Sequence, residues 1–206
     1  MILERVCVGP MQVNCYILAD KVGGEAIIID PGAQTRLIQK VLDKHKFKPA
    51  FVVNTHGHYD HIGSDDAFGV PVYIHSADAA CLKEPKLNLS FFFGVPSEVK
   101  SEVRILEEDQ ILKLEGIELK VLHLPGHTAG GIGLLLQEPD EHMVFTGDSL
   151  FYLSIGRTDL AGGSESLLLK VIKEKLLNLP DDTKVYPGHG PSSTIGEEKK
   201  NNPFLM

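Results

Sequence analysis

Three histidines and an aspartate crowd into the segment THGHYDH at residues 55–61, directly after the apolar run AFVVN at residues 50–54. A short continuous apolar run predicts a buried strand. The segment is then a loop at the carboxyl end of that strand, where α/β proteins usually place their sites. Imidazole and carboxylate groups are ligands for zinc, iron and manganese. Because composition alone would produce such a string in roughly one sequence per thousand, the segment predicts a metal site.

His56 and His58 are two residues apart, so both side chains can point to one side of an extended loop. Asp60 and His61 then project in a different direction. One loop therefore has the side chains to serve two neighbouring metal positions. The alternative is a plain solvated loop, but such loops rarely gather three imidazoles beside a carboxylate.

Three later segments each carry one more potential ligand beside a glycine, again after an apolar stretch. They are PGHT at residues 125–128 with His127, TGDS at residues 146–149 with Asp148, and YPGHG at residues 186–190 with His189. Taken singly, each would be read as an ordinary glycine turn. Because all three accompany the THGHYDH loop in one chain, they predict a single site built from distant parts of the sequence.

Strand and helix patterns alternate along the chain. Buried strands are expected at residues 25–30 and 50–54, and further strands at 12–19, 132–136, 143–145 and 185–186. A short strand at 70–74 contains Pro71, which indicates an edge strand or the start of a strand. Short antiparallel strands are expected at residues 104–106, 110–114 and 117–124, and helices at 37–46, from 76 to before 85, from 165 to before 180, and near 195–200, with Ser164 as an N-cap. Interleaving of this kind predicts an α/β protein with both sheet faces covered. With no repeat or linker, residues 1–206 are expected to form one domain.

Composition excludes several classes of protein. The formal net charge of −8 argues against nucleic acid as a partner, and no apolar run approaches the roughly 18 residues of a membrane span. The three cysteines include no CxxC pair, so neither a disulfide framework nor a zinc knuckle is expected. Without a basic leader before an apolar stretch, we predict a cytoplasmic protein, with Cys15 packed in a strand.

The ordered set of segments resembles the metallo-β-lactamase fold superfamily, and within it the branch similar to glyoxalase II. The matching segments are NCYIL, IIIDPGA, THGHYDH, LPGHTAG, FTGDSLF, SIGRTDL, YPGHG and the closing NNPF, so the resemblance covers nearly the whole chain. It implies a four-layer αββα sandwich with the metal site at one edge, between the two sheets.

The resemblance also implies which residues bind metal. His56, His58 and His127 would hold a first ion, Asp60, His61 and His189 a second, and Asp148 would bridge them. The two divalent ions would be zinc, with iron and manganese as alternatives. The remaining histidines match no ligand position and are expected at the surface or in strands; they are His45, His75, His123 and His142.

For this branch the resemblance implies a hydrolase acting on an S-2-hydroxyacyl thioester such as S-lactoylglutathione. A metal-bound hydroxide would attack the carbonyl carbon, with Asp60 orienting it as a catalytic residue. A thiol has a pKa near 8.5, so a thiolate leaves without a dedicated proton donor, which an amide nitrogen would need. Classical members have a further C-terminal helical region for glutathione and a Tyr after the last histidine. This sequence has Gly190-Pro191 there and ends soon after, so the identity of the thiol stays open.

Arg157, in the segment SIGRTD, is one of only four arginines. It has two interpretations: a local ion pair with Asp159, or a clamp for the carboxylate of an anionic substrate, which an acidic protein would otherwise repel. The resemblance favours the clamp, because a basic residue in this loop lies near the active-site mouth of relatives.

Other functions of the same fold remain open. An iron persulfide dioxygenase would use one iron held by His56, His127 and Asp148, with open positions for O₂ and a thiol-derived substrate. A lactonase would use the same hydroxide on an ester, and a scaffold without catalysis would leave the ligands idle. The sequence specifies no oligomeric state. The run Phe91-Phe92-Phe93 cannot face one core as a whole, so we expect at least one ring to be partly exposed unless another surface covers it. The run is expected to form a lid over the pocket or part of its wall, and the alternatives are a subunit interface and packing beneath a long loop.

Overall fold

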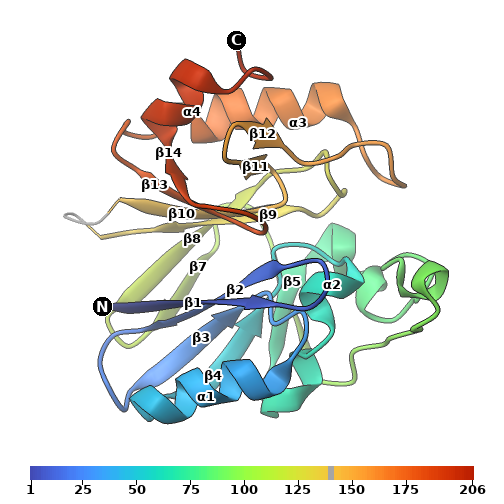
Figure 1. Cartoon of the computed structure of the whole chain (residues 1–206), viewed down its shortest axis with the longest axis vertical. Helices are drawn as coiled ribbons and strands as arrows, with labels where there is room; N and C mark the ends of the chain where they lie inside the picture. Colours follow the sequence, from blue (N-terminus) through green and yellow to red (C-terminus); the bar gives the residue numbers. More distant parts are fainter. Residues whose placement is uncertain (139–141) are drawn as a thin grey trace.

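Two six-stranded sheets lie face to face at the centre of the computed structural model, which describes residues 1–138 and 142–206 (Figure 1). The first sheet has the order β1-β2-β3-β4-β5-β6, with strands Ile2–Val8, Val13–Ala19, Glu25–Ile29, Lys48–Val53, Val72–His75 and Val103–Leu106. The second has the order β14-β13-β10-β9-β8-β7, with strands Ser193–Thr194, Lys184–Pro187, Met143–Gly147, Ile132–Leu136, Ile117–His123 and Ile111–Leu114. Both sheets are mixed, since parallel pairs such as β3–β4 and β10–β13 stand beside antiparallel ones.

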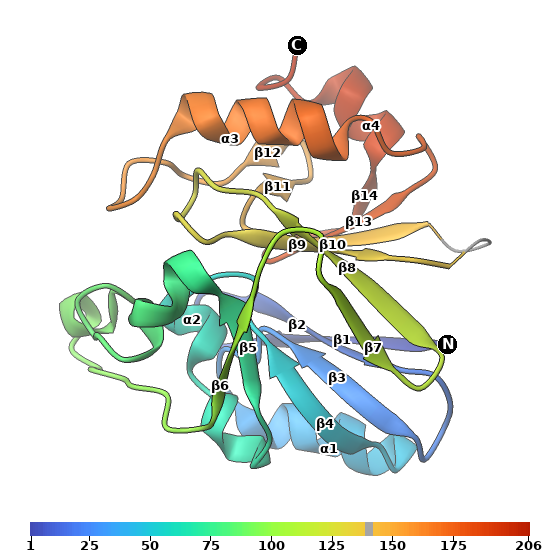
Figure 2. The same cartoon turned by 180° about the vertical axis from the view of Figure 1, so that it is seen from behind.

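Helices cover the outer face of each sheet (Figures 1 and 2). Helix α1 (Thr35–His45) lies against the first sheet, and α3 (Glu165–Val171) and α4 (Ile195–Asn201) lie against the second. A small hairpin of β11 (Leu150–Phe151) and β12 (Ser154–Ile155) lies beneath these two helices. The predicted four-layer αββα sandwich is therefore confirmed. No helix in the described parts of the chain is long and apolar enough to span a bilayer.

Three apolar clusters separate the four layers. Alternate residues of β2 explain how: Tyr16 and Leu18 face the cluster between the sheets, whereas Cys15 and Ile17 face the cluster under α1. The third cluster joins the second sheet to α3 and α4. Strand β2 is buried along its whole length, and Cys15 is packed there as expected.

Short helical segments occupy the two connections on either side of β5. Between β4 and β5 lie α2 (Tyr59–Ile62) and the 3₁₀ segment η1 (Asp65–Phe68), and between β5 and β6 lie the 3₁₀ segments η2 (Ser76–Leu82) and η3 (Ser90–Phe93). The helix predicted from residue 76 is thus a 3₁₀ helix. The predicted helix from residue 165 begins as α3, with Ser164 capping the Leu167 amide as expected, and ends in a π-helical turn, Ile172–Leu176.

One predicted set of strands is wrong in its pairing. Residues 104–106 do not join the antiparallel strands that follow them, because β6 pairs in parallel with β5 in the first sheet. Only β7 and β8 pair antiparallel as predicted. Two further strands at the sheet edges were not predicted, β1 and the two-residue β14, so the strand at residues 185–186 is not the last.

Candidate metal centre

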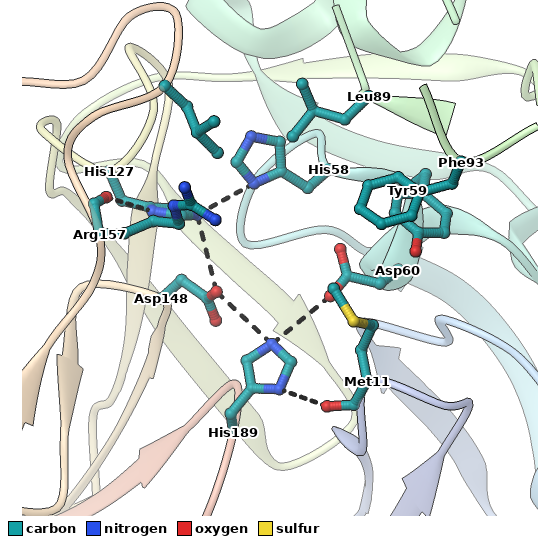
Figure 3. Close-up of a pocket in the computed structure, with 11 residues that line it drawn as sticks. Met11, His58, Tyr59, Asp60, Leu89, Phe93, His127, Asp148, Arg157 and His189 are labelled. Carbon is teal, nitrogen blue, oxygen red and sulfur yellow. Dashed lines mark hydrogen bonds and ion pairs between the residues drawn. The ribbon is translucent and has the colours of Figure 1, made fainter. Parts of the chain in front are cut away.

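Four ligand-bearing segments meet at one edge of the sandwich, each following the carboxyl end of a strand (Figure 3). The first segment follows β4 and includes α2, and the others follow β8, β10 and β13. The structure thereby brings together all seven side chains that the resemblance implied as metal ligands: His56, His58, Asp60, His61, His127, Asp148 and His189.

The first group of potential ligands consists of His56, His58 and His127, all buried. The Nδ1 atom of His58 lies 3.1 Å from His56 Nε2 and 3.0 Å from His127 Nε2. His58 has an extended backbone, φ −72° and ψ 145°, which turns its imidazole to the same side as that of His56. The two-residue spacing thus has the effect expected from the sequence.

The second group consists of Asp60, His61 and His189. Both residues of the pair from α2 face His189: its Nε2 atom lies 3.5 Å from Asp60 Oδ2 and 3.3 Å from His61 Nε2. Helix α2 has only four residues, and it brings Asp60 and His61 to His189, whereas His56 and His58 meet His127. The two groups adjoin, because His56 and His61 also form a possible set with Asp148. One loop therefore contributes to both groups.

Asp148 lies between the two groups. Its carboxylate oxygens are 3.6 Å from His127 Nε2 in the first group, and 3.5 Å from both His61 Nε2 and His189 Nε2 in the second. Its Oδ1 atom is buried and accepts no hydrogen bond. A buried carboxylate oxygen without a donor is costly unless a cation occupies the space beside it.

The second ring nitrogen of each of three histidines donates to an oxygen outside the cluster. His61 Nδ1 donates to Asp30 Oδ2 at 3.0 Å, His127 Nδ1 to the Arg157 carbonyl at 2.8 Å, and His189 Nδ1 to the Met11 carbonyl at 3.0 Å. These bonds fix the orientation of the rings and direct each Nε2 atom into the cluster, where it can bind a metal ion once it carries no proton. Metal-binding histidines in proteins have this arrangement.

The charges around the cluster favour a cation. Burial lowers the pKa of His56 well below its ordinary value and lowers that of His58 to about 3, so both rings are neutral, as ligands must be. Burial would also lower the pKa of His61, but the carboxylates around it, Asp148 foremost, outweigh burial and raise that pKa to about 10. The field that retains a proton on this imidazole would also attract a divalent metal ion.

The distances within the cluster fit a metal centre. Ligand atoms about 2.1 Å from one ion in tetrahedral geometry lie about 3.4 Å from each other. The contacts above, 3.0–3.6 Å, fall around this value. Neutral imidazoles, carboxylates and an orphaned Asp148 oxygen together make this donor set suitable for two divalent ions of the zinc, iron or manganese type.

Two glycines beside the ligands are required by close approach. A Cβ atom on Gly188 would lie 2.2 Å from Asp148 Oδ1, and one on Gly147 would lie 2.4 Å from Thr55 Oγ1. Gly147 also has a φ of +49°, which disfavours other residues. The glycines that flank the ligands in the sequence are thus needed for the loops to meet.

Asp30 supports the cluster from beneath, a role the sequence analysis did not assign. It is almost fully buried, and its Oδ1 accepts the Thr55 amide at 2.7 Å. Its Oδ2 accepts from Thr55 Oγ1 at 2.7 Å and from His61 Nδ1 at 3.0 Å. One carboxylate thus holds both the start of the ligand loop and a ligand ring. Its only sequence signal is its place at the end of the apolar run Ile27–Ile29.

Asp78, in η2, is a second buried carboxylate that the sequence analysis missed. Its Oδ2 accepts the Gly57 amide at 3.0 Å and its Oδ1 accepts the Gly130 amide at 2.6 Å. Gly57 lies between two ligands of the first sheet, and Gly130 lies in the His127 loop of the second. Asp78 therefore fastens the two ligand loops to each other across the gap between the sheets.

Strand β2 supports the His189 turn. The Asn14 side chain donates to the carbonyls of Pro187 at 3.0 Å and Gly190 at 2.8 Å. The Tyr16 hydroxyl donates to the Pro187 carbonyl at 2.8 Å. A first-sheet strand thus fixes a potential ligand, His189, that the second sheet carries.

The cluster forms the floor of a cavity of about 310 Å³. Arg157 lines this cavity, as one interpretation of the sequence requires (Figure 3). Its guanidinium also makes two 2.8 Å hydrogen bonds to Asp159, as the other interpretation requires. Both side chains are exposed, so the pair is weak and can open at little cost.

The four other histidines lie outside the cluster. His45 ends α1 and contacts Glu4. His75 at the end of β5 stacks on His123 at the end of β8, with ring centroids 4.0 Å apart. His142 is exposed beside Asp182. Their positions in strands or near the surface agree with the expectation, and His75 is a buried residue of strand β5.

We expect His58→Ala to remove about one ion per chain and to leave the second group occupied, because His58 contacts only ligands of the first group. The strand-end position predicts little change in unfolding. Elemental analysis and thermal unfolding of the purified variant measure both effects. His142→Ala, which removes an exposed imidazole, is the matched control and should keep wild-type metal content; full metal content in His58→Ala would contradict the assignment.

Comparison with known proteins agrees with this geometry. The profile described as the metallo-beta-lactamase superfamily matches residues 8–189, which include all seven side chains of the cluster. The hydroxyacylglutathione hydrolase GloC of Haemophilus influenzae is 38% identical over 100% of this chain and 98% of its own. The probable metallo-hydrolase YqgX of Bacillus subtilis is 36% identical over 98% of this chain and 96% of its own.

Solved structures show the same similarity. A protein described as the BLEG-1 B3 metallo-beta-lactamase superposes with a TM-score of 0.93 and 39% identity, covering 100% of both chains. TTHA1623, in a di-iron-bound form, superposes with a TM-score of 0.82 and 36% identity, covering 98% of this chain and 100% of its own.

Proposed function

The chain belongs to the metallo-β-lactamase superfamily, and we propose that within it the protein is a binuclear hydrolase of acyl thioesters. The observation that carries the proposal is the position of Asp148, within 3.6 Å of histidine nitrogens from both ligand groups. A carboxylate in that position would help to hold an ion in each of the two ligand groups. Two bound divalent ions would polarise a carbonyl oxygen and lower the pKa of a coordinated water.

The chain's own residues would position the reactants. Asp60 lines the cavity and keeps its Oδ2 towards His61 and His189. Burial raises the pKa of Asp60, but His61 and His189 outweigh burial and lower this pKa below its ordinary range. An ionised Asp60 can accept a hydrogen bond from a water molecule on the cavity floor and orient it towards a carbonyl carbon.

The leaving group favours a thioester over an amide. Around the cavity floor, the described lining residues are metal-ligand candidates, apolar side chains, Tyr59 and Arg157. The pKa of Tyr59 is raised above its ordinary value by burial and by Asp60, which makes it a poorer acid for an amide nitrogen. A thiolate needs no such donor. The similarity to GloC, described as a hydroxyacylglutathione hydrolase, supports the same substrate class.

We expect Arg157→Ala to raise KM about tenfold for a thioester whose thiol carries a carboxylate, with kcat little changed, and to leave KM unchanged for a neutral thioester. A lost contact that binds substrate and transition state equally appears in KM. Steady-state kinetics with both substrates checks this. An equal response of both substrates would make Arg157 structural, with Asp159 as its partner.

The second candidate, a mononuclear iron dioxygenase acting on persulfides, would use only His56, His127 and Asp148. It is disfavoured because the second group, Asp60, His61 and His189, is assembled as fully as the first. The di-iron form of TTHA1623 is consistent with iron in either reaction. Finding iron in this protein would therefore not distinguish the hydrolase from the dioxygenase.

One experiment separates the candidates. The purified protein is analysed for metals, and the same sample is assayed with S-lactoylglutathione, a lactone, a β-lactam and, with an oxygen electrode, glutathione persulfide. Two ions per chain with thioester hydrolysis and no oxygen uptake is the expected result. One iron with oxygen uptake would identify the dioxygenase, and β-lactam cleavage alone would match the similarity to BLEG-1 instead.

A further inference from the structure

An apolar wall rises on one side of the cavity. It consists of Met11, Tyr59, Leu89 and Phe93, and we use the term apolar wall for these four residues. The remaining apolar lining residue, Leu160, follows Arg157 in the chain and is not counted with them. In Figure 3 Tyr59, Phe93 and Leu89 lie on one side of His58, and Arg157 lies on the other. Apart from the candidate metal ligands, Arg157 is the only charged residue among the described residues that line the cavity.

The three phenylalanines of η3 have different surroundings. Phe93 packs on Tyr59 with ring centroids 4.8 Å apart and faces the cavity. Phe91 and Phe92 contact each other at 5.7 Å and are not part of the lining. Phe93 nevertheless remains 55% exposed and Phe92 70% exposed. The expectation that at least one would be exposed is therefore met, and only Phe93 faces the metal centre.

The segment that carries the apolar wall is fixed in place. Asn88 is fully buried and donates to the carbonyls of Cys81 and Ser97. Its own carbonyl accepts the Tyr59 amide at 2.9 Å, so the wall is attached to the residue before Asp60. Leu89 has a φ of +72°, a conformation that costs energy for a bulky residue and that the surrounding structure must hold in place.

A preformed apolar surface beside a polar reaction centre fits a hydrocarbon group of the substrate. Exposed apolar side chains gain free energy only when something apolar covers them. The carbonyl carbon of a thioester carries two substituents, the acyl chain and the thiol group. In the proposed function the thiol group has the carboxylate that Arg157 binds. The acyl chain would then extend to the other side of the cavity, towards the apolar wall.

We propose that the apolar wall is the acyl subsite and selects thioesters with an apolar acyl chain of several carbons over acetyl or short hydroxyacyl groups. This inference rests on the proposed function. The inference goes beyond the proposed function because it specifies the acyl group, which the potential metal ligands do not constrain. Phe93 would be the specificity-determining residue, because its ring covers Tyr59 and faces the cavity.

The test compares acetyl, butyryl and hexanoyl thioesters of 3-mercaptopropionate with the metal-loaded protein. A buried methylene contributes up to about fourfold; over a half-exposed wall we expect kcat/KM to rise on the order of tenfold from acetyl to hexanoyl. Phe93→Ala should remove most of this rise and Phe93→Leu should keep it. Phe92→Ala, an equal truncation outside the cavity, is the matched control and should keep the full rise.

Binding measured by calorimetry separates the acyl subsite from the reaction. The probes are the S-methyl and S-hexyl thioethers of 3-mercaptopropionate, which have no carbonyl to cleave. Tighter binding of the hexyl thioether, lost in Phe93→Ala but not in Phe92→Ala, is the expected result even if no thioester is hydrolysed, in which case only the proposed function fails. Hydrolysis without a chain-length preference, or equal effects of the two alanine variants, would overturn the acyl subsite and leave the hydrolase standing.

Discussion

Asp148→Asn is expected to lose metal from both ligand groups and to lower kcat/KM by on the order of 10³-fold, since a metal centre contributes several kcal/mol to the transition state. Asparagine has the same shape but no charge, so the crowded contact with Gly188 is preserved and the fold should not change. Elemental analysis and thioester hydrolysis on one preparation measure both effects.

The contrast with His58→Ala makes this result specific. Removing a ligand of one group should cost about one ion, whereas removing the charge between the groups should cost both. Asp182→Asn, which neutralises an exposed carboxylate beside His142, controls for the change in net charge and should behave as wild type. If Asp148→Asn kept one ion per chain, Asp148 would belong to a single group.

Asp30→Ala is expected to lower the free energy of unfolding by about 3–5 kcal/mol, the usual cost of removing one partner from a buried charged pair. Its carboxylate accepts three hydrogen bonds, and none of the donors has access to water. Metal affinity should fall as well, because the His61 ring loses the acceptor that fixes its tautomer. Denaturant unfolding and metal titration test the two effects.

Asp30→Asn separates these two roles of the carboxylate. Asparagine tolerates the positive φ of 51° at this position and retains one acceptor oxygen, so most of the stability should return. It lacks the charge that stabilises the His61 ring, so metal affinity should remain reduced. If Asp30→Ala kept wild-type stability and wild-type metal affinity, Asp30 would have no supporting role.

The ligand residues were accessible from the sequence because metal chemistry restricts the residue types so strongly. His56, His58, Asp60 and His61 stand in one segment, and the other three stand beside glycines after strands. Close approach between loops requires those glycines, as Gly188 and Gly147 show, so the pattern of ligand and glycine reflects a real packing constraint. The layer order of the fold followed from the resemblance that these segments carry.

Strand pairing was less accessible. The four residues of β6 have a clear strand pattern, but alternation of side chains does not say which strand is the partner, and β6 joins a strand almost thirty residues earlier instead of the next one. Strand β1 was missed because it lies at a sheet edge and is only partly buried, which blurs the alternation that marks a strand.

The supporting carboxylates were not accessible for a different reason. Asp30 and Asp78 accept backbone amides from loops that lie far from them in sequence. A single aspartate after a strand or in a short helix has many possible uses, and its role depends on which loops fold over it. Only the three-dimensional arrangement shows that these two residues join the ligand segments.

The described chain passes from one sheet to the other at a single connection, between β6 and β7. Each sheet is therefore a contiguous stretch of sequence with its own helices, and each carries an incomplete set of ligands: His56, His58, Asp60 and His61 on the first, His127, Asp148 and His189 on the second. Neither stretch can complete either three-residue group by itself. Fragments cut at this connection would thus regain high-affinity metal binding only by reassociating, so metal uptake would report directly on complementation between the two halves.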